Sequence, residues 1–285
     1  MNKRTSFFRH LCWICIFTLA ILRGGAIFGE TVPDTKVDLV SNLYQFSGET
    51  TFYVGFLITP SKGWHTYWTN PGDSGSPMRF KWEIPEGFKE LETIWPAPSR
   101  IISGDVVNYG YVGETMIATR FMAPKTLTPN QVIEVRLTAN WVVCEEVCVA
   151  ETKVLSILFR TGHLKFDPGR RKIYKFLSEL PKAYPFPTTA VATLSEVVVN
   201  FQDPKHQRIA SAYIFPDSSV PISASAKQNI SRDPGGFSLT MPLESPVIVE
   251  ISGFIQLSYI DGTSEIFQLD AFAVNKKVSP KKEKR

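Results

Sequence analysis

The sequence comprises 285 residues, of which 44% are hydrophobic and 20% are charged, a composition typical of a globular protein rather than a disordered or collagen-like one. The formal net charge of +4 comes from the two ends, because residues 1–29 hold four basic side chains and no acidic one, and residues 276–285 hold six basic side chains against Glu283. Residues 30–275 carry 21 basic and 26 acidic residues, a net charge of −5, which excludes a nucleic-acid-binding role for the body of the protein.

The first 29 residues have the layout of a secretory signal peptide. Basic residues 1–10 precede twelve apolar or small residues, 11–22, and further small residues follow before residue 30. Twelve residues are fewer than the roughly 20 that a membrane-spanning helix needs. We therefore expect cleavage and an exported, soluble protein. An uncleaved N-terminal membrane anchor is the alternative, favoured by Arg23 and the imperfect cleavage motif.

Within the apolar segment, Cys12 and Cys15 form a C-x-x-C motif of the kind found in thioredoxin-like redox sites. No strand or helix scaffold surrounds the two residues. We therefore assign them no redox function, and the mature chain is left with two cysteines, Cys144 and Cys148.

The first half of the mature chain predicts short β-strands. Apolar residues alternate with others over 78–84 and 133–141, and β-branched and aromatic residues are frequent over 51–59 and 153–160. Proline and glycine interrupt the segments between them. This pattern is typical of a β-sandwich, which we expect over residues 30–162.

A linker with a short helix follows over residues 163–187. Asp167 is the predicted N-cap, Pro168 begins a helix that continues to Leu180, and Pro181 ends it.

A second β-sandwich is predicted over residues 188–275, followed by a basic tail over 276–285. Its last two strands flank Asp261-Gly262, a hairpin sequence. No catalytic constellation occurs in this half. The predicted strands are 196–201, 210–215, 237–241, 247–251, 254–260 and 265–274.

Two catalytic patterns are rejected. Residues 72–77, G-D-S-G-S-P, resemble the surroundings of the serine nucleophile in trypsin-like proteases, which place their His and Asp far upstream. Only about forty residues of mature chain precede Ser74, so we interpret the segment as a loop.

The histidines of the mature chain, His65, His163 and His206, are scattered and lack partner motifs. We therefore expect no metal site, and no cofactor motif is present. His65 lies in an aromatic segment and is interpreted as a packed or surface residue.

Three interpretations of Cys144 and Cys148 are open: buried free thiols, a structural disulfide and a redox-active dithiol. Export disfavours free thiols. Closing a five-residue loop contributes only about 2 kcal/mol, against about 4.7 kcal/mol for 100 residues, so a purely structural bridge gains little. We favour the redox-active dithiol.

The spacing of the two cysteines demands a sharp turn. Residues four apart in a strand are separated by about 13 Å, whereas a disulfide needs Cα atoms about 4.4–6.8 Å apart. The chain must therefore turn at Glu145 and Glu146, leaving both sulfurs at an accessible bend. Because no basic residue occurs between 137 and 152, we expect Glu145, Glu146 and Glu151 to disfavour the thiolate form.

Five segments of the sequence occur together in one order: 63–68 (G-W-H-T-Y-W), 70–75 (N-P-G-D-S-G), 95–98 (W-P-A-P), 111–114 (Y-V-G-E) and 141–148. With these segments, residues 35–160 resemble the N-terminal periplasmic domain of the transmembrane disulfide reductase DsbD, including its ScsB-like relatives. The second half resembles the extra β domain of the ScsB-like proteins only loosely. Three residues separate the cysteines, as in the ScsB-like branch and fewer than in DsbD itself.

The resemblance implies an immunoglobulin-like sandwich that acts as a thiol-disulfide oxidoreductase, a protein-disulfide reductase component. Cys148 would form the mixed disulfide with a partner, and Cys144 would resolve it. The family shields its disulfide with an aromatic cap loop, here residues 105–113, in which Tyr111 or Tyr109 would cover the sulfurs. Ordinary sandwich packing is the alternative for both tyrosines.

The implied partners are a membrane-embedded thiol electron donor and periplasmic clients, namely thioredoxin-like proteins such as disulfide isomerases or cytochrome-maturation factors. The sequence shows no membrane helices or thioredoxin-like domain after the cysteines, so we expect another polypeptide to supply electrons. The alternative is a non-enzymatic β-sandwich, a binding or assembly module with a structural or vestigial disulfide.

Overall fold

The computed structural model describes residues 34–217, 220–245 and 250–275, with side chains up to residue 270. The predicted signal peptide, Cys12, Cys15 and the basic tail lie outside these residues. So does the start of the strand predicted over 247–251.

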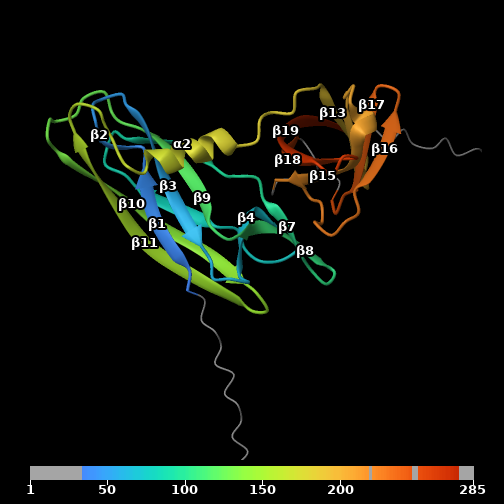
Figure 1. The fold of residues 1–285 in the computed structure, drawn as a ribbon, viewed down its shortest axis with the longest axis horizontal. Coiled ribbons are helices and arrows are strands. Elements are labelled where there is room, and N and C mark those ends of the chain that lie inside the picture. Colours follow the sequence, from blue (N-terminus) through green and yellow to red (C-terminus); the bar gives the residue numbers. More distant parts are fainter. Residues whose placement is uncertain (1–33, 218–219, 246–249, 276–285) are drawn as a thin grey trace, which may run out of the picture. The chain divides into compact units, whose positions relative to one another are not determined.

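The described chain consists of β-strands with one α-helix and one short 3-10 turn, which confirms the predicted all-β class (Figure 1). In the first half, one sheet has the strand order β1-β3-β9-β6, and a second has the order β12-β2-β11-β10-β4-β8-β7, with β5 paired to β10. The strands are β1 (Lys36–Ser41), β2 (Leu43–Phe46), β3 (Thr51–Thr59), β4 (His65–Gly72), β5 (Arg79–Glu83), β6 (Lys89–Ile94), β7 (Ser99–Ser103), β8 (Val106–Val112), β9 (Thr115–Met122), β10 (Val132–Cys144), β11 (Cys148–Thr161) and β12 (Lys165–Phe166).

Strand β10 follows the alternation predicted for it. Alternate residues from Ile133 to Val143 are buried, while most residues between them are exposed or half-buried. Trp141 packs against Phe56 of β3, with ring centroids 5.8 Å apart, so side chains from both sheets share one core. β10 and β11 form a long antiparallel hairpin from the pair Val132–Arg160 to the pair Cys144–Cys148.

The helix α2 (Arg170–Glu179) lies where the linker helix was predicted, but its N-cap differs. Gly169 is the N-cap, and Asp167 instead accepts a hydrogen bond of 2.7 Å from the Gly169 N–H. Asp167 therefore stabilises the turn before the helix rather than its first turn. Ile173, fully buried, packs on Leu57 and Met116, which fixes α2 against the first sandwich.

The second half has one connected sheet with the strand order β15-β18-β19-β13-β14-β17-β16. Strand β19 pairs with β18 over its first part and with β13 at its end, so it joins two layers around a separate apolar core. The elements are β13 (Thr188–Ala192), β14 (Glu196–Phe201), η1 (His206–Arg208), β15 (Ile209–Pro216), β16 (Asn229–Asp233), β17 (Gly236–Pro242), β18 (Glu250–Tyr259) and β19 (Ser264–Asn275).

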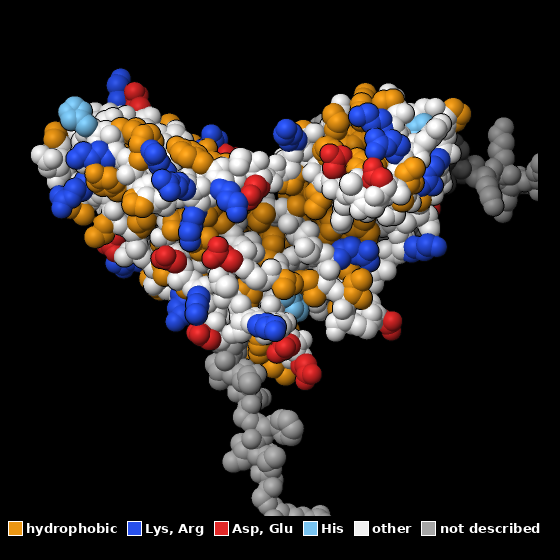
Figure 2. All heavy atoms as spheres, viewed as in Figure 1, with side chains coloured by type: hydrophobic (Ala, Val, Ile, Leu, Met, Phe, Trp, Pro, Cys, Tyr) orange, Lys and Arg blue, Asp and Glu red, His pale blue; other side chains and the backbone are white. Residues whose placement is uncertain are grey.

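All described residues belong to one compact unit, and the two halves share part of their packing. The core around Trp68 and Tyr109 of the first sandwich also contains Phe215 and Ala224 of the second half. The ring of Trp68 lies 5.6 Å from that of Phe254, measured between centroids. Charges are mixed on the face drawn in Figure 2, where Lys and Arg side chains are interspersed with Asp and Glu.

Candidate functional site

The candidate site lies at the tip of the β10–β11 hairpin. Cys144 ends β10 and Cys148 begins β11, and the two residues are direct partners in the antiparallel register. A disulfide joins them across a Cα–Cα distance of 4.2 Å. The chain turns between them, and the Glu145 N–H donates a 3.2 Å hydrogen bond to the Val147 carbonyl. The sharp turn that the spacing demands is therefore present.

The two sulfur-bearing residues differ in their exposure. Cys144 is only 3% exposed, whereas Cys148 is exposed. Cys144 lies on the face of β10 opposite to the buried positions 133–143, and it is buried there because it pairs with Cys148 on one side and with His65 of β4 on the other. We expected both sulfurs at an accessible bend, but Cys144 is buried and only Cys148 of the pair is exposed.

An exposed apolar residue lies next to Cys148. Val147 in the turn is 54% exposed. A second, Val112 of β8, is 68% exposed and lies in the same cross-strand row, three strands away from Cys148, because it pairs with His65, which pairs with Cys144. Both valines add exposed apolar area at this end of the sheet.

Tyr67 of β4 is the tyrosine whose hydroxyl reaches a sulfur among the described residues. Its Oη lies 3.8 Å from Cys148 Sγ, and its side chain is only 1% exposed. Burial raises the pKa of Tyr67, so the hydroxyl stays protonated at neutral pH and is able to donate to a sulfur. Sequence reasoning treated Tyr67 only as part of an aromatic segment, because nothing in the sequence indicates that β4 lies beside β10.

His65 is packed in the protein, in agreement with its interpretation from the sequence. Its ring lies edge-on to Tyr67, with centroids 5.2 Å apart, and the residue is 9% exposed. Burial lowers the pKa of His65, so the imidazole is neutral at pH 7. Within the described part of the chain, its Nε2 is buried without a hydrogen-bond partner.

The acidic residues around the disulfide occupy different environments. Glu145 and Glu146 are exposed in the turn. The Glu145 carboxylate lies against the turn before β4, where a Cβ on Gly63 would be 2.2 Å from Oε1, and Gly63 has a positive φ of 92°. A side chain at position 63 would therefore displace this carboxylate. Glu151 is engaged elsewhere, because it accepts a 2.7 Å hydrogen bond from Trp141 Nε1.

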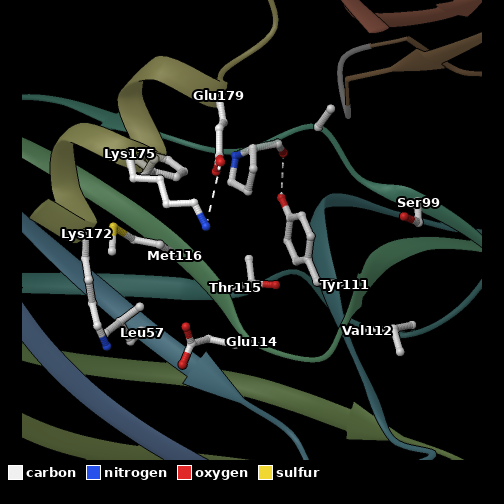
Figure 3. Close-up of a pocket in the computed structure, with 13 residues that line it drawn as sticks. Leu57, Ser99, Tyr111, Val112, Glu114, Thr115, Met116, Lys172, Lys175 and Glu179 are labelled. Atoms are coloured by element: carbon white, nitrogen blue, oxygen red, sulfur yellow. Dashed lines mark hydrogen bonds and ion pairs between the residues drawn. The ribbon is translucent and has the colours of Figure 1, made fainter. Parts of the chain in front are cut away.

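Tyr109 and Tyr111, the predicted cap residues, are both buried, with exposures of 0% and 5%. The hydroxyl of Tyr109 lies 2.7 Å from that of Tyr213 in the second half. The hydroxyl of Tyr111 donates a 2.9 Å hydrogen bond to the carbonyl of Pro96 (Figure 3). Burial raises the pKa of both phenols, so they remain neutral.

A groove of about 520 Å³ lies between α2 and the edge of the first sandwich (Figure 3). Its lining combines apolar side chains such as Leu57 and Met116 with Lys172 and Glu114. Val112 also lines the groove. Val112 pairs with His65, which pairs with Cys144, so one wall of the groove belongs to the same cross-strand row as the disulfide.

Other site types have no support in the described residues. No group of three or more His, Cys, Asp or Glu side chains in them is placed to hold a metal ion. Across the same ranges, no helix has the length and apolar character required to span a bilayer.

Residues 39–160 match the family described as "Thiol:disulfide interchange protein DsbD, N-terminal". The N-terminal periplasmic domain of ScsB from Proteus mirabilis has a similar structure, with a TM-score of 0.60, 14% sequence identity and coverage of 84% of this chain and 93% of that one. This likeness shows the fold. No curated protein matches the sequence.

Two further structures give weaker matches. The titin tandem immunoglobulin domains A164–A165 have a TM-score of 0.18 at 11% identity, covering 85% of this chain and 99% of that one. The periplasmic chaperone SfaE has a TM-score of 0.23 at 9% identity, covering 84% and 100%. The likeness to the ScsB domain supports the predicted all-β fold, and the two weaker matches add nothing to it.

Proposed function

We propose that the chain is an exported thiol-disulfide exchange module that relays electrons through Cys144 and Cys148, on the basis that residues 39–160 match the DsbD N-terminal family. The observation that carries the proposal is the unequal exposure of the disulfide. Cys148 is open to a partner thiol, while Cys144 is 3% exposed and is held next to it at a Cα–Cα distance of 4.2 Å. This arrangement suits one attacking and one resolving cysteine.

In the reduced module, the Cys148 thiolate attacks one sulfur of a client disulfide. The client S–S bond breaks, a mixed disulfide forms at Cys148, and the second client sulfur leaves as a thiolate that takes up a proton. The Cys144 thiolate then attacks Cys148 Sγ and releases the first client sulfur, which is also protonated. The client gains two electrons and two protons, and the module is left with its disulfide. A donor dithiol reverses these steps and restores the reduced module.

The surroundings of Cys148 support its role as the nucleophile. The Tyr67 hydroxyl, 3.8 Å from Cys148 Sγ, is placed to donate to a thiolate and thereby favour it. Glu145 and Glu146 act in the opposite direction as pKa-modulating residues, since negative charge in the turn disfavours a second anion. These opposing effects should favour the thiolate form of Cys148 only moderately.

The proposed partners follow from the family and from the surface around the disulfide. A membrane-embedded thiol donor recharges the module, and periplasmic thioredoxin-like proteins or disulfide isomerases are its clients. Val112 and Val147 provide apolar contact for such partners. The ScsB domain of similar fold is periplasmic by its description, and with the signal-peptide pattern of residues 1–29 this supports a periplasmic location. Tyr109 or Tyr111 in residues 105–113 remains a proposed shield.

Trapping of a mixed disulfide tests this function. In a Cys144→Ser variant the resolving step is blocked, so one defined partner should remain attached through Cys148 and be released by a reductant. The matched Cys148→Ser variant should trap no partner, because Cys144 is buried. Absence of any trapped partner from a periplasmic extract contradicts the relay.

A structural disulfide is the second candidate, favoured by the hairpin register. Cys144 and Cys148 are direct cross-strand partners, so their bond fastens the end of a long hairpin and would do so in a non-enzymatic binding or assembly module. The reduction potential distinguishes the two functions. A potential below about −300 mV indicates a structural bond, and a higher one a bond that partners can reduce.

A further inference from the structure

The loop between β4 and β5 contains the segment that resembles a protease motif, and it contacts both the second half of the chain and the redox site. We propose that Asp73 in this loop is a positioning residue, through which the second half holds Tyr67 against Cys148. The inference rests on the proposed redox function, since it concerns the reactivity of the same disulfide.

The Asp73 carboxylate joins three segments of the chain. Its Oδ1 accepts hydrogen bonds from Ser223 Oγ at 2.7 Å and from the Ala224 N–H at 2.8 Å. Its Oδ2 accepts a 3.0 Å hydrogen bond from the Val107 N–H of β8. Burial alone would raise the pKa of Asp73, but the hydrogen bonds from Ser223 and Val107 outweigh this and lower the pKa. The carboxylate is therefore ionised at neutral pH, and these are charge-assisted bonds.

The segment that binds Asp73 is itself fixed to the first sandwich. The carbonyl of Ala224 accepts a 2.8 Å hydrogen bond from the Tyr213 hydroxyl, which lies 2.7 Å from the Tyr109 hydroxyl. The guanidinium of Arg100 stands 4.2 Å above the Tyr213 ring. Ala224 is thus hydrogen-bonded through both its N–H and its carbonyl. The segment to which Asp73 binds is therefore fixed in place.

From Asp73 the loop leads directly onto Tyr67. Ser74 donates from its N–H and its hydroxyl to Asn108 Oδ1, at 3.1 and 3.0 Å, which anchors the next residue to β8. Gly75 then lies on the Tyr67 ring so closely that a Cβ would be 2.3 Å from Cε1 and Cζ. Its φ of 86° also favours glycine. The backbone of this loop therefore covers the ring and limits its movement.

Tyr67 transmits this restraint to the sulfur, because its hydroxyl lies 3.8 Å from Cys148 Sγ. When Asp73 loses its hydrogen bonds, the loop is held less firmly and the ring is free to swing away from Cys148. An incoming thiolate then meets less obstruction at the sulfur it attacks. The second half of the chain is in this way a part of the redox site, although it has no cysteine.

The test is the rate at which dithiothreitol reduces the Cys144–Cys148 bond in the full chain. Asp73→Asn should raise the rate constant about three- to tenfold, the scale of the net contribution of one ordinary hydrogen bond. Ser223→Ala removes only one exposed hydroxyl, leaves the fold intact and should give a smaller increase in the same direction. Glu86→Gln, an exposed carboxylate of the same sandwich, is the control and should equal the wild type.

A Tyr67→Ala background separates positioning from general loosening. Because Asp73 acts through Tyr67, adding Asp73→Asn to Tyr67→Ala should change the rate no further. Equal rates for Asp73→Asn, Ser223→Ala and the wild type overturn the positioning role, and so does an Asp73→Asn effect that persists without Tyr67. A wild-type bond that resists dithiothreitol overturns the redox function as well, whereas a reducible bond with equal rates overturns the positioning role alone.

Discussion

Two long hairpins of the molecule close in different ways. The cysteine hairpin, β10–β11, ends in Glu145, Glu146 and Val147 and is closed by the Cys144–Cys148 bond. The Asp-Gly hairpin, β18–β19, closes without a covalent cross-link, with Gly262 at a φ of 84° and the Asp261 carboxylate accepting a 3.0 Å hydrogen bond from the Thr263 N–H. At that turn the Tyr259 N–H donates to the Thr263 carbonyl at 2.9 Å.

The two hairpins differ in how the tip is closed. Asp261 and Gly262 are favourable turn residues, so the Asp-Gly hairpin forms without a covalent bond. The cysteine hairpin has no glycine, asparagine or proline at its tip, and like charges are adjacent there. Its tip is closed by a disulfide, a bond that thiol-disulfide exchange is able to open, in keeping with the proposed redox function.

The largest change in the free energy of unfolding is expected from a substitution in the stem of the cysteine hairpin. Trp141→Ala removes a side chain that is 2% exposed, together with its hydrogen bond to Glu151, and should lower the free energy of unfolding by about 3–5 kcal/mol. Urea unfolding followed by tryptophan fluorescence and circular dichroism measures it. Trp141→Phe is the matched control with a smaller loss. A loss under about 1 kcal/mol for the alanine variant would mean that the turn, not the stem, holds this hairpin.

Opening the disulfide should have the next largest effect. Reduction removes the closure of a five-residue loop, so the free energy of unfolding should fall by about 2 kcal/mol. Urea unfolding with and without reductant measures the difference, and the Cys144→Ser/Cys148→Ser double variant, which should not respond to reductant, is the control. A loss well above 4 kcal/mol would indicate a bond on which the fold itself depends.

A smaller effect is expected at the other turn. Gly262→Ala places a Cβ in the left-handed region and should cost about 1 kcal/mol, although open space surrounds the position. Thermal unfolding measures this loss. The control is Gly235→Ala at the β16–β17 turn, where no positive φ is involved. Equal losses for both variants would show that left-handed geometry does not set the stability of the Asp-Gly hairpin.

The smallest effect concerns pH near the cysteine hairpin. The pKa of His65 is lowered in the folded state, so the unfolded chain binds its proton first as pH falls below the ordinary value of about 6.5. The stability contributed by neutral His65 is present above pH 6.5 and is lost as pH falls toward the folded pKa. Urea unfolding at pH 7.5, 6.5 and 5.5 should show this slope. His65→Gln should flatten it, and an unchanged slope would contradict the assignment.

Many of the strands could be predicted from local patterns in the sequence. Residues 51–59 were predicted as a strand and coincide with β3, and 196–201 coincide with β14, because apolar and β-branched residues mark them clearly. β4 (His65–Gly72) was not predicted, since most of its residues are buried on both faces and alternation is lost. Only its aromatic residues were noted from the sequence, and residues 72–77, which begin at the end of this strand, were interpreted as a loop.

The candidate site was predictable only in part. Cys144 and Cys148 stand out from composition, and their spacing indicates a turn. Which sulfur is exposed, and that Tyr67 touches it, depends on the pairing of β4 with β10, which links residues far apart in the sequence. The role proposed for Asp73 likewise depends on Ser223 and Ala224, about 150 residues away, so no local motif reveals it.

The unequal burial of the two cysteines has a consequence for oxidative damage. Hydrogen peroxide meeting the reduced protein reaches Cys148, and the sulfenic acid it forms there has Cys144 as its immediate neighbour. Condensation of the two expels water and restores the disulfide before a second oxidation produces the irreversible sulfinic acid. The geometry proposed to guide a client sulfur to Cys148 would therefore also protect that atom from permanent inactivation.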